Sequence, residues 1–341
     1  MNEDIVHLVR DVRQNPDENT RAAARLMSLL ENHPARITEL YAGLADWPEP
    51  LMVLGITGPP GAGKSTLVDQ LIELYRKRHP QRRLGVIAVD PSSHASKGSV
   101  MGDRVRMMRH ATDPHVFVRS LAARGHLGGL ALGVRGVLRV MGLMQCQLVL
   151  IETVGVGQSE MEVAEFADMV AIVLAPGQGD GIQLLKSGLM ETGDVFVVNK
   201  ADRDGAIQLH SQLLTTLNLR SSVADAGAPP PVCMTSALGG DGMEGFLNLL
   251  EDHCARSGDQ WLLQRRQRFE QEVEQAVLQE AHRRLADMLR TSGIGSEGIT
   301  RILRGETTVN ELATMLLQQL SLIHISEPTR QLMSSRMPSS A

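Results

Sequence analysis

Short apolar runs alternate with stretches of helical spacing through the middle of the chain. This alternation is typical of an α/β fold in which a mostly parallel central sheet is flanked by helices. Ligands of such sheets bind beyond the carboxyl ends of the strands, so the residues that follow each run are the first candidates for a site. The runs are Leu51–Thr57, Leu84–Val89, His115–Val118, Gln147–Ile151, Met169–Leu174, Val195–Val198 and Pro231–Met234.

The two ends of the chain carry apolar positions at helical spacing only. Before the sheet region, a break at Asn15–Asp17 predicts a helical hairpin that packs on the sheet domain. Beyond residue 242 the same periodicity predicts the helices Met243–His253 and Trp261–Thr291 and a further segment of roughly Ser296–Leu320.

These patterns divide the chain into four parts. We expect an N-terminal helical extension at 1–46, the sheet domain at 47–253, a C-terminal helical region at 254–319 and a tail at 320–341. The tail opens with Leu320–Arg330, which resembles translated adapter or vector sequence. No core-forming periodicity follows it, so we expect the tail to be non-native and irregular.

Composition and charge restrict the classes of partner. Aromatic residues are 3% of the 341 residues and hydrophobic residues 43%, so the core must be largely aliphatic. A net charge of -5 without a long basic run argues against nucleic acid or an anionic membrane as a partner. Three cysteines at no ligand spacing fit a reducing compartment, and His253-Cys254 has no second pair with which to bind a metal. With a polar start and no apolar run near the roughly 20 residues of a membrane span, we expect a cytoplasmic protein.

A phosphate-binding loop follows the first run. The residues Gly58-Pro59-Pro60-Gly61-Ala62-Gly63-Lys64-Ser65 match G-x-x-x-x-G-K-[ST], and a helical pattern begins at Thr66. Glycines let successive backbone N–H groups turn toward phosphate oxygens at the positive end of the next helix. Lys64 is then expected to reach the β- and γ-phosphates and Ser65 to bind magnesium. A chance match in a Gly-rich turn is the alternative.

Three acidic residues after later runs are candidate magnesium ligands, because this cation prefers oxygen ligands. Asp90 ends the second run, Asp103 follows in Gly102-Asp103-Arg104, and Glu152 ends the fourth run. Asp90 could instead cap a helix, and Asp103 could be an exposed acid paired with a neighbouring arginine. Glu152 stands where many GTPases have the aspartate of D-x-x-G, and its extra methylene makes a water-bridged role as plausible as direct ligation.

Two glycine-rich loops are candidate switches. Gly155 and Gly157 follow Glu152, and an N–H at such a glycine can sense a γ-phosphate. A plain strand-to-helix turn is the alternative. The loop Gly177–Lys186 follows the fifth run, and from the residues alone a flexible connection is equally consistent with it.

The pattern Asn199-Lys200-Ala201-Asp202 after the sixth run indicates which nucleotide base the chain recognises. An aspartate that accepts from the ring N1–H and the exocyclic amine of guanine would find no matching donor pair on adenine. The pattern therefore predicts guanine. After the seventh run, Ser236-Ala237-Leu238 stands where a backbone loop completes a guanine pocket, and Ser236 could also cap the following helix.

Read together, the motifs resemble those of the MeaB/ArgK family of GTPases over about residues 20–320. The resemblance implies a P-loop NTPase fold of the SIMIBI class, which includes the nickel-insertion chaperones and signal-recognition GTPases. The motifs are Gly58–Ser65, Asp90–Ser93, Gly102–Arg104, Gly125–Gly129, Glu152–Glu160, Gly188–Glu191 and Asn199–Asp202.

The resemblance also implies a function. Members are GTPase chaperones of an adenosylcobalamin-dependent acyl-CoA mutase, most often methylmalonyl-CoA mutase, and the class usually forms homodimers. By position, Lys64, Asp103 and Glu152 fall on the catalytic and switch groups, with Gln183 and Lys186 in a switch that responds to the partner. The implied ligands are GTP or GDP and magnesium, and the implied activity is slow GTP hydrolysis. The family continues Asp90–Ser93 with a proline and a double glycine, whereas this chain has His94–Gly98.

Two other functions remain open at this point. A nickel-insertion GTPase would need a Cys/His cluster to handle the metal. An ATPase or kinase linked to basic amino-acid transport is the older interpretation of the family, and Asn199–Asp202 argues against it because the pattern is specific for guanine.

Overall fold

The computed structural model describes residues 3–16, 18–33, 50–90, 108–110, 112–122, 129–153, 163–177, 189–224, 228–256, 258–291 and 294–326. Two compact units divide the chain, at residues 1–262 and 263–341, and each is described by itself. No helix among the described residues is long and apolar enough to cross a membrane.

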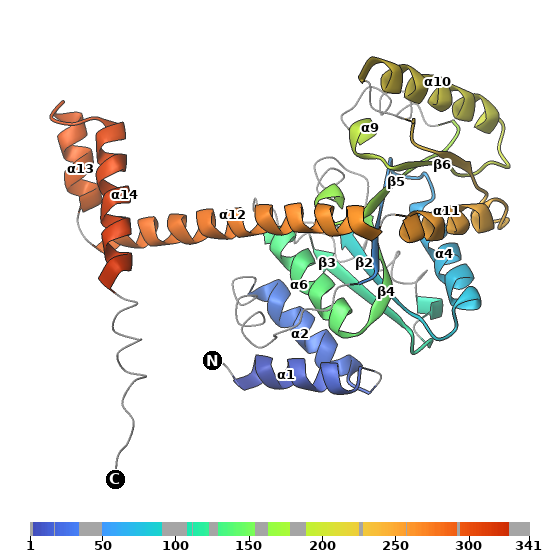
Figure 1. Ribbon diagram of the computed structural model, residues 1–341, viewed down its shortest axis with the longest axis horizontal. Coiled ribbons are helices and arrows are strands. Elements are labelled where there is room, and N and C mark those ends of the chain that lie inside the picture. The colour runs from blue at the N-terminus through green and yellow to red at the C-terminus, as the bar shows by residue number, and fades with distance from the viewer. Residues whose placement is uncertain are drawn as a thin grey trace, which may run out of the picture. The chain divides into compact units, whose positions relative to one another are not determined.

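A seven-stranded, fully parallel sheet forms the centre of the first unit (Figure 1). Its spatial order is β3-β2-β4-β1-β5-β6-β7, so the strand before the phosphate-binding loop lies in the middle. Each predicted run forms a strand, and the predicted α/β fold is confirmed. The strands are β1 Met52–Thr57, β2 Arg83–Asp90, β3 Val116–Ala122, β4 Cys146–Thr153, β5 Met169–Leu174, β6 Val195–Val198 and β7 Val232–Met234.

Both faces of the sheet are buried, which explains why the strands are apolar throughout rather than alternating. In β5, Val170, Ile172 and Leu174 pack into one hydrophobic cluster, while Met169, Ala171 and Val173 pack into another on the opposite face. Aliphatic side chains dominate both clusters, as the composition predicts.

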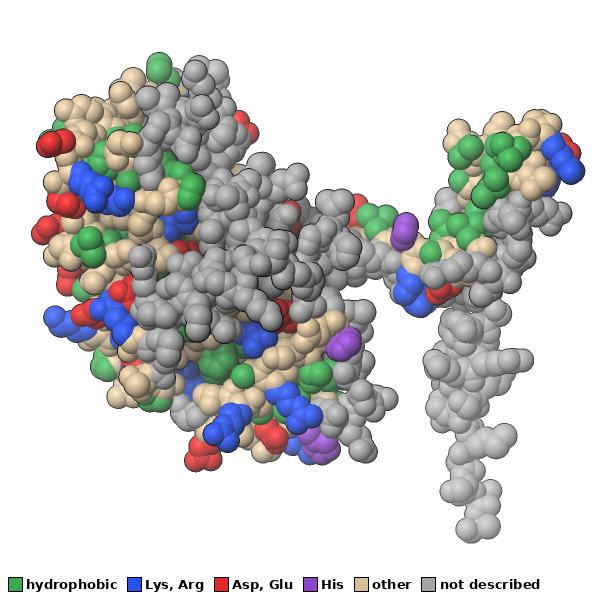
Figure 2. All heavy atoms as spheres, turned by 180° about the vertical axis from the view of Figure 1, so that it is seen from behind, with side chains coloured by type: hydrophobic (Ala, Val, Ile, Leu, Met, Phe, Trp, Pro, Cys, Tyr) green, Lys and Arg blue, Asp and Glu red, His purple; other side chains and the backbone are tan. Residues whose placement is uncertain are grey.

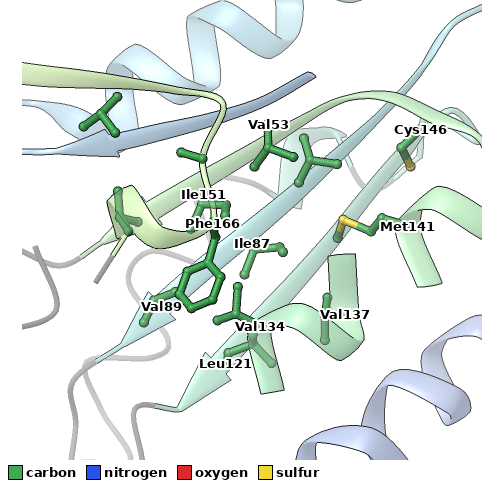
Figure 3. Close-up of a cluster of buried hydrophobic side chains, with 14 of the residues drawn as sticks. Val53, Ile87, Val89, Leu121, Val134, Val137, Met141, Cys146, Ile151 and Phe166 are labelled. Atoms are coloured by element: carbon green, nitrogen blue, oxygen red, sulfur yellow. The ribbon is translucent and has the colours of Figure 1, made fainter. Parts of the chain in front are cut away.

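Helices cover the two faces. On one face lie α4 (Lys64–Arg78) and α11 (Met243–Arg256). The other face carries α6 (Gly129–Leu143), η3 (Val163–Glu165), α9 (Leu189–Thr192) and α10 (Ala206–Ala224). Figure 3 shows how Val134, Val137 and Met141 of α6 point toward Ile87 and Ile151 of the sheet. A short 3-10 helix, η2, spans Met108–His110.

The predicted N-terminal hairpin is present as α1 (Glu3–Gln14) and α2 (Thr20–Asn32), which lie beside α6 (Figure 1). The helices approach closely because Gly136 of α6 has no side chain, and a Cβ there would lie 3.0 Å from Cβ of Leu30. Arg119 of β3 donates to Glu31 over 2.5 Å, which ties α2 to the edge of the sheet.

In the second unit, α12 (Gly258–Thr291, which begins before the unit boundary) is followed by α13 (Ile294–Leu303) and α14 (Val309–Ser326). The segment predicted at roughly Ser296–Leu320 is therefore helical, but a turn divides it into two helices. Gly305, at φ +71°, ends α13: its N–H donates to Ile302, and the N–H of Glu306 donates to Arg301.

A capping box starts the next helix. Thr308 Oγ1 accepts from the N–H of Glu311 over 3.2 Å, and the Glu311 carboxylate accepts from the N–H of Thr308 over 3.0 Å. The expectation that the chain is irregular from Leu320 is wrong for 320–326, where α14 continues. Residues 327–341 lie outside the described part of the chain.

Candidate functional site

The loop between β1 and α4 follows a path that requires glycine at two positions. Gly58 has φ +139°, and a Cβ there would lie 2.1 Å from the carbonyl oxygen of Val173 in β5. Gly63, which precedes α4, has φ +93°, and a Cβ there would lie 2.4 Å from Nδ2 of Asn199. A side chain at either position would clash with a neighbouring loop or strand, so these glycines let the loop pack tightly at the end of the sheet.

Lys64 brings a positive charge to this loop from the first residue of α4. Its Nζ donates to the carbonyl oxygens of Gly58 over 2.7 Å and Pro59 over 3.0 Å. The side chain is only 6% exposed. The ammonium group, the N–H groups at the start of α4 and the helix dipole therefore favour an anion at the same place. Thr66, two residues further on, is partly exposed in the first turn.

Ser65 and Glu152 meet at the carboxyl edge of the sheet. Ser65 Oγ donates to Oε1 of Glu152 over 2.6 Å, and Glu152 is 4% exposed in β4. Glu152 lies beside Ile56 of β1 in the parallel register. Two oxygen ligands from separate elements are thus close together, which is the chemistry that a hard divalent cation requires.

Two threonines to which the motifs give no role of their own support these residues. Thr153 Oγ1 donates to Thr57 Oγ1 over 3.1 Å, and both side chains are fully buried at the ends of β4 and β1. Thr57 directly precedes the phosphate-binding loop and Thr153 directly follows Glu152, and these places are the signal that could have identified them. The contact fixes the separation of the two strand ends from which the loops depart.

The other acidic candidates are only partly described. The backbone of Asp90 ends β2, whose Val89 lies beside Thr153 in the register, so this residue ends its strand at the same sheet edge. Its side chain, and the whole of Asp103, lie outside the described residues, as do Gly155, Gln183 and Lys186. Within the described ranges, no group of three or more His, Cys, Asp or Glu side chains could hold a metal ion.

Asn199 joins the phosphate-binding loop to the segment after β7. Its Nδ2 donates to the carbonyl oxygen of Ala62 over 2.9 Å, and its Oδ1 accepts from the backbone N–H of Ala237 over 3.1 Å. Thr235 Oγ1 also donates to Oδ1, over 3.3 Å. The side chain is 1% exposed. Asn199 was predicted from the sequence to contact the base; its described contacts join the phosphate-binding loop to the segment after β7.

Lys200 adds a second connection to the phosphate-binding loop. Its backbone adopts φ +58°, a left-handed conformation that is uncommon for a residue with a side chain. From there Nζ donates to the carbonyl oxygen of Gly61 over 2.6 Å. The alkyl chain of Lys200 therefore extends from the segment after β6 to the phosphate-binding loop.

Asp202 and Ser236 form a pair at the edge of this site. Ser236 Oγ donates to Oδ1 of Asp202 over 2.6 Å, and this hydrogen bond holds the pKa of Asp202 below its usual value. The carboxylate is exposed and ionised at neutral pH, so its second oxygen can accept from a ligand. Leu238 follows with 89% of its side chain exposed.

The predicted site residues that are described therefore come together from four segments far apart in the sequence. The loops after β1, β4, β6 and β7 converge at the carboxyl edge of the sheet, as expected for a parallel α/β fold. One set of groups suits phosphate and a divalent cation, and the other presents a fixed carboxylate beside an apolar side chain.

Comparisons with known proteins identify the family of this chain. The family described as "Methylmalonyl Co-A mutase-associated GTPase MeaB" matches residues 23–301. A putative GTPase of Pyrococcus abyssi is 42% identical over 261 residues, which are 75% of this chain and 80% of that protein. GTPase ArgK of Escherichia coli is 37% identical over 201 residues, which are 58% of this chain and 60% of that protein.

A mouse protein and a solved structure extend the comparison. The methylmalonic aciduria type A homolog, mitochondrial, of Mus musculus is 36% identical over 193 residues, covering 56% of this chain and 46% of that protein. The crystal structure of LAO/AO transport system kinase superposes with a TM-score of 0.62 at 22% identity, covering 94% of this chain and 99% of that chain. At this identity the superposition shows a shared fold.

Proposed function

This chain belongs to the MeaB family and is a GTPase, and from that premise we propose that it gates adenosylcobalamin loading of an acyl-CoA mutase. The observation that carries the proposal is the match of residues 23–301 to a family described as methylmalonyl Co-A mutase-associated. The relative in mouse, whose name refers to methylmalonic aciduria, gives further support. The proposed client is methylmalonyl-CoA mutase.

In the proposed mechanism, hydrolysis depends on positioning and electrostatics rather than on a strong base. Water attacks the γ-phosphorus, the bond to the β–γ bridging oxygen breaks, and GDP and phosphate leave, with the proton of water ending on phosphate. Lys64 and the N–H groups of the phosphate-binding loop offset the charge that develops on the phosphate oxygens. Turnover by the chain alone is slow, and contact with the client accelerates it.

Magnesium is part of this proposal. The residues that would hold it are Ser65 and Glu152, together with Asp90 and Asp103, and the 2.6 Å contact between Ser65 and Glu152 fits two oxygen ligands of one cation. When bound, Mg²⁺ supplies charge neutralisation at the β- and γ-phosphates. Ser65 would contribute its ligand from α4 and Glu152 from β4.

Guanine selectivity is assigned to Asp202. Its carboxylate accepts from N1–H and the exocyclic amine, while Ser236 holds its orientation through the 2.6 Å hydrogen bond. Asn199 and Lys200 keep the base loops and the phosphate loop at a fixed separation, so base and triphosphate are recognised together. Ala237 and Leu238 complete the pocket wall.

We further propose a homodimer that acts in the cytoplasm. The second unit exposes large apolar side chains, among them Phe269 and Val273 of α12 and Ile299 and Leu303 of α13. Figure 2 shows hydrophobic side chains gathered on the surface of the helices of this unit. A second copy would bury them. Gln183 and Lys186 are the proposed switch residues that respond to the client.

The test is co-purification with a cobalamin-dependent methylmalonyl-CoA mutase, followed by a GTPase assay with and without it. We expect complex formation that depends on the nucleotide and a several-fold rise in GTP turnover. Lys64→Ala, purified and folded, should lose hydrolysis with and without the mutase. An unchanged turnover in the presence of the mutase, with no complex in either nucleotide state, would overturn the proposed client.

A further inference from the structure

Hydrogen bonds and peptide links form a closed ring at the carboxyl edge of the sheet. The ring joins three pairs of residues that are adjacent in the sequence, Thr57-Gly58, Lys64-Ser65 and Glu152-Thr153. Lys64 Nζ donates to the carbonyl oxygen of Gly58 over 2.7 Å. Ser65 Oγ donates to Glu152 Oε1 over 2.6 Å. The bond of 3.1 Å from Thr153 Oγ1 to Thr57 Oγ1 closes the ring.

The end of β4 is held from both faces of the sheet by this ring. Successive side chains of a strand point to opposite faces. In β4, Leu150 packs into the hydrophobic cluster that contains α4, and Ile151 packs into the cluster that contains α6. Glu152 therefore points to the α4 side, where it meets Ser65, and Thr153 points to the α6 side.

The threonine contact extends the connection between β1 and β4 beyond their backbone ladder. Ile56 and Glu152 are the last pair of residues in register between the two strands. Thr57 and Thr153 each stand one residue further on, and they are 0% and 1% exposed. Their hydroxyl groups thus hold the two chains together where the ladder has ended. Because the hydrogen bond is shielded from water, it is stronger than an exposed one.

The threonines differ from the other members of the ring in their relation to the ligands. In the proposed function Lys64 binds phosphate, and Ser65 and Glu152 bind magnesium. Neither threonine hydroxyl takes part in that binding, so the contact between them does not need to break when the ligands enter. A substitution at either threonine therefore changes the geometry of the ring without removing a ligand group.

We infer that the contact between Thr57 and Thr153 positions Glu152 for magnesium binding. The inference rests on the proposed function, in which Ser65 and Glu152 hold Mg²⁺. Since Glu152 directly precedes Thr153, a shift of Thr153 away from Thr57 moves the glutamate relative to β1 and to the phosphate-binding loop. Groups that orient metal ligands commonly change metal affinity by about tenfold or more. Loss of the contact should therefore weaken Mg²⁺ binding more than it weakens nucleotide binding without the metal.

The experiment titrates Mg²⁺ into the complex of the protein with a fluorescently labelled GDP, and measures GTP hydrolysis over the same Mg²⁺ range. Thr153→Val removes the donor and nearly keeps the shape of the side chain. We expect its half-maximal Mg²⁺ concentration to rise about tenfold in both measurements, while GDP affinity in the presence of a chelator changes less than about twofold. Thr153→Ser keeps a hydroxyl group and should resemble the wild type.

A double variant separates positioning from stability. In Thr153→Val the buried hydroxyl of Thr57 loses its donor, so the melting temperature should fall. In Thr57→Val with Thr153→Val both partners become apolar groups of the same shape, and the melting temperature should recover. The weaker Mg²⁺ binding should persist, because the bond is still missing. If the double variant instead regains the wild-type Mg²⁺ dependence, the contact is purely structural and the inference is overturned. The same double variant provides the test if Thr153→Val does not fold.

A matched control is Thr215→Val on α10, which removes an exposed hydroxyl that donates to the carbonyl oxygen of Ser211 and should leave Mg²⁺ binding unchanged. Wild-type Mg²⁺ binding in folded Thr153→Val would overturn the inference. Glu152→Gln separates the inference from its premise. An unchanged Mg²⁺ affinity in Glu152→Gln removes both, whereas a change there but not in Thr153→Val overturns the inference alone.

Discussion

The side-chain amide of Asn199 donates to the carbonyl oxygen of Ala62 over 2.9 Å, across 137 residues of sequence. Since the amide oxygen accepts from the backbone of Ala237 and the hydroxyl of Thr235, one buried side chain connects the phosphate-binding loop with the segment after β7. A buried amide with partners on both atoms specifies a single arrangement of the loops.

Replacing this amide should affect stability and binding together. Asn199→Ala leaves buried backbone groups of Ala62 and Ala237 without their side-chain partner, so the free energy of unfolding should fall by about 1–3 kcal/mol. GTP and GDP should both bind at least tenfold more weakly. Denaturant unfolding and equilibrium nucleotide binding measure these effects. Asn199→Asp keeps the acceptor oxygen and loses the donor to Ala62. If this variant loses as much nucleotide affinity as Asn199→Ala, the loss is assigned to the phosphate-loop contact. Wild-type affinity in Asn199→Ala would contradict the proposed connection.

A methyl group at Gly63 should displace the loop. A Cβ at this position would lie 2.4 Å from Nδ2 of Asn199, and φ +93° is strained for alanine. Gly63→Ala should therefore weaken GTP binding at least tenfold and lower the melting temperature. The matched control is Gly245→Ala in the exposed part of α11, where no atom lies within 4 Å of the added Cβ. This control should bind GTP normally and gain about 0.5–1 kcal/mol in unfolding free energy, because alanine restricts the unfolded chain. Equal affinity in both variants would show that the Gly63 contact does not matter.

The base preference should follow the chemistry of residue 202. Asp202→Asn exchanges one acceptor for a donor, so guanine loses a partner for its exocyclic amine. Xanthine, which has a carbonyl oxygen there, gains one. We expect weaker GTP binding and stronger xanthosine triphosphate binding, measured by competition against a labelled nucleotide. Asp204→Asn, an exposed acid two residues further on, is the control. An unaltered preference would remove Asp202 from the base pocket.

The pH dependence of guanine binding follows from the same residue. The hydrogen bond from Ser236 holds the pKa of Asp202 below its usual value, so the carboxylate remains ionised throughout the range near neutrality. Guanine selectivity should therefore be constant between about pH 5 and 8 and fall only as the pH drops through this lowered pKa. Ser236→Ala removes the donor, and the fall should then begin at higher pH. An identical profile in both proteins would show that Ser236 does not influence the carboxylate.

An ion-pair cluster between α4 and α11 should make the free energy of unfolding depend on pH in the acidic range. Burial alone would raise the pKa of Glu251, but hydrogen bonds from His79, over 2.6 Å, and Arg78, over 2.8 Å, outweigh burial and lower it. A lowered folded pKa gives stability that is present above the unfolded pKa of about 4.3 and lost as the pH falls through the folded value.

The variant that tests this cluster is Glu251→Gln. At pH 7 it should lower the free energy of unfolding by about 1 kcal/mol, and the difference from the wild type should shrink as the pH falls through the lowered pKa of Glu251. Asp252→Asn on the same helix removes an exposed pair with Arg256 and should change stability by less than about 0.5 kcal/mol. A difference that persists in acid would show that Glu251 contributes through packing rather than charge.

The strands could be predicted from the sequence because both faces of the sheet are buried. Val195–Val198, for example, is an unbroken apolar run bounded by polar residues, and β6 has the same bounds. The spatial order could not be predicted, since β1 lies between β4 and β5 through contacts that no local pattern encodes. The break between α13 and α14 has local signals, Gly305 and the Thr308–Glu311 box, which apolar periodicity alone overlooks.

For the candidate site, the motifs predicted which residues take part but not what each of them does. The roles of the glycines and Lys64 can be predicted because these residues stand in one contiguous motif. The contacts of Asn199 cannot, because its partners Ala62 and Ala237 are brought to it only by the tertiary structure. The hydroxyl contact of Thr57 with Thr153 joins two strand ends that are 96 residues apart in the sequence, and the motif Glu152–Glu160, which contains Thr153, does not indicate that partner.

The central place of β1 has a consequence for local unfolding. β1 is paired along both edges, to β4 and to β5, so exposing its amides to solvent requires the middle of the sheet to open. Amide hydrogens of Leu54 and Ile56 should be among the slowest in the protein to exchange with deuterium, at rates that approach those of global unfolding. The loop that begins at Gly58 is thus attached to the part of the sheet that is expected to open least often.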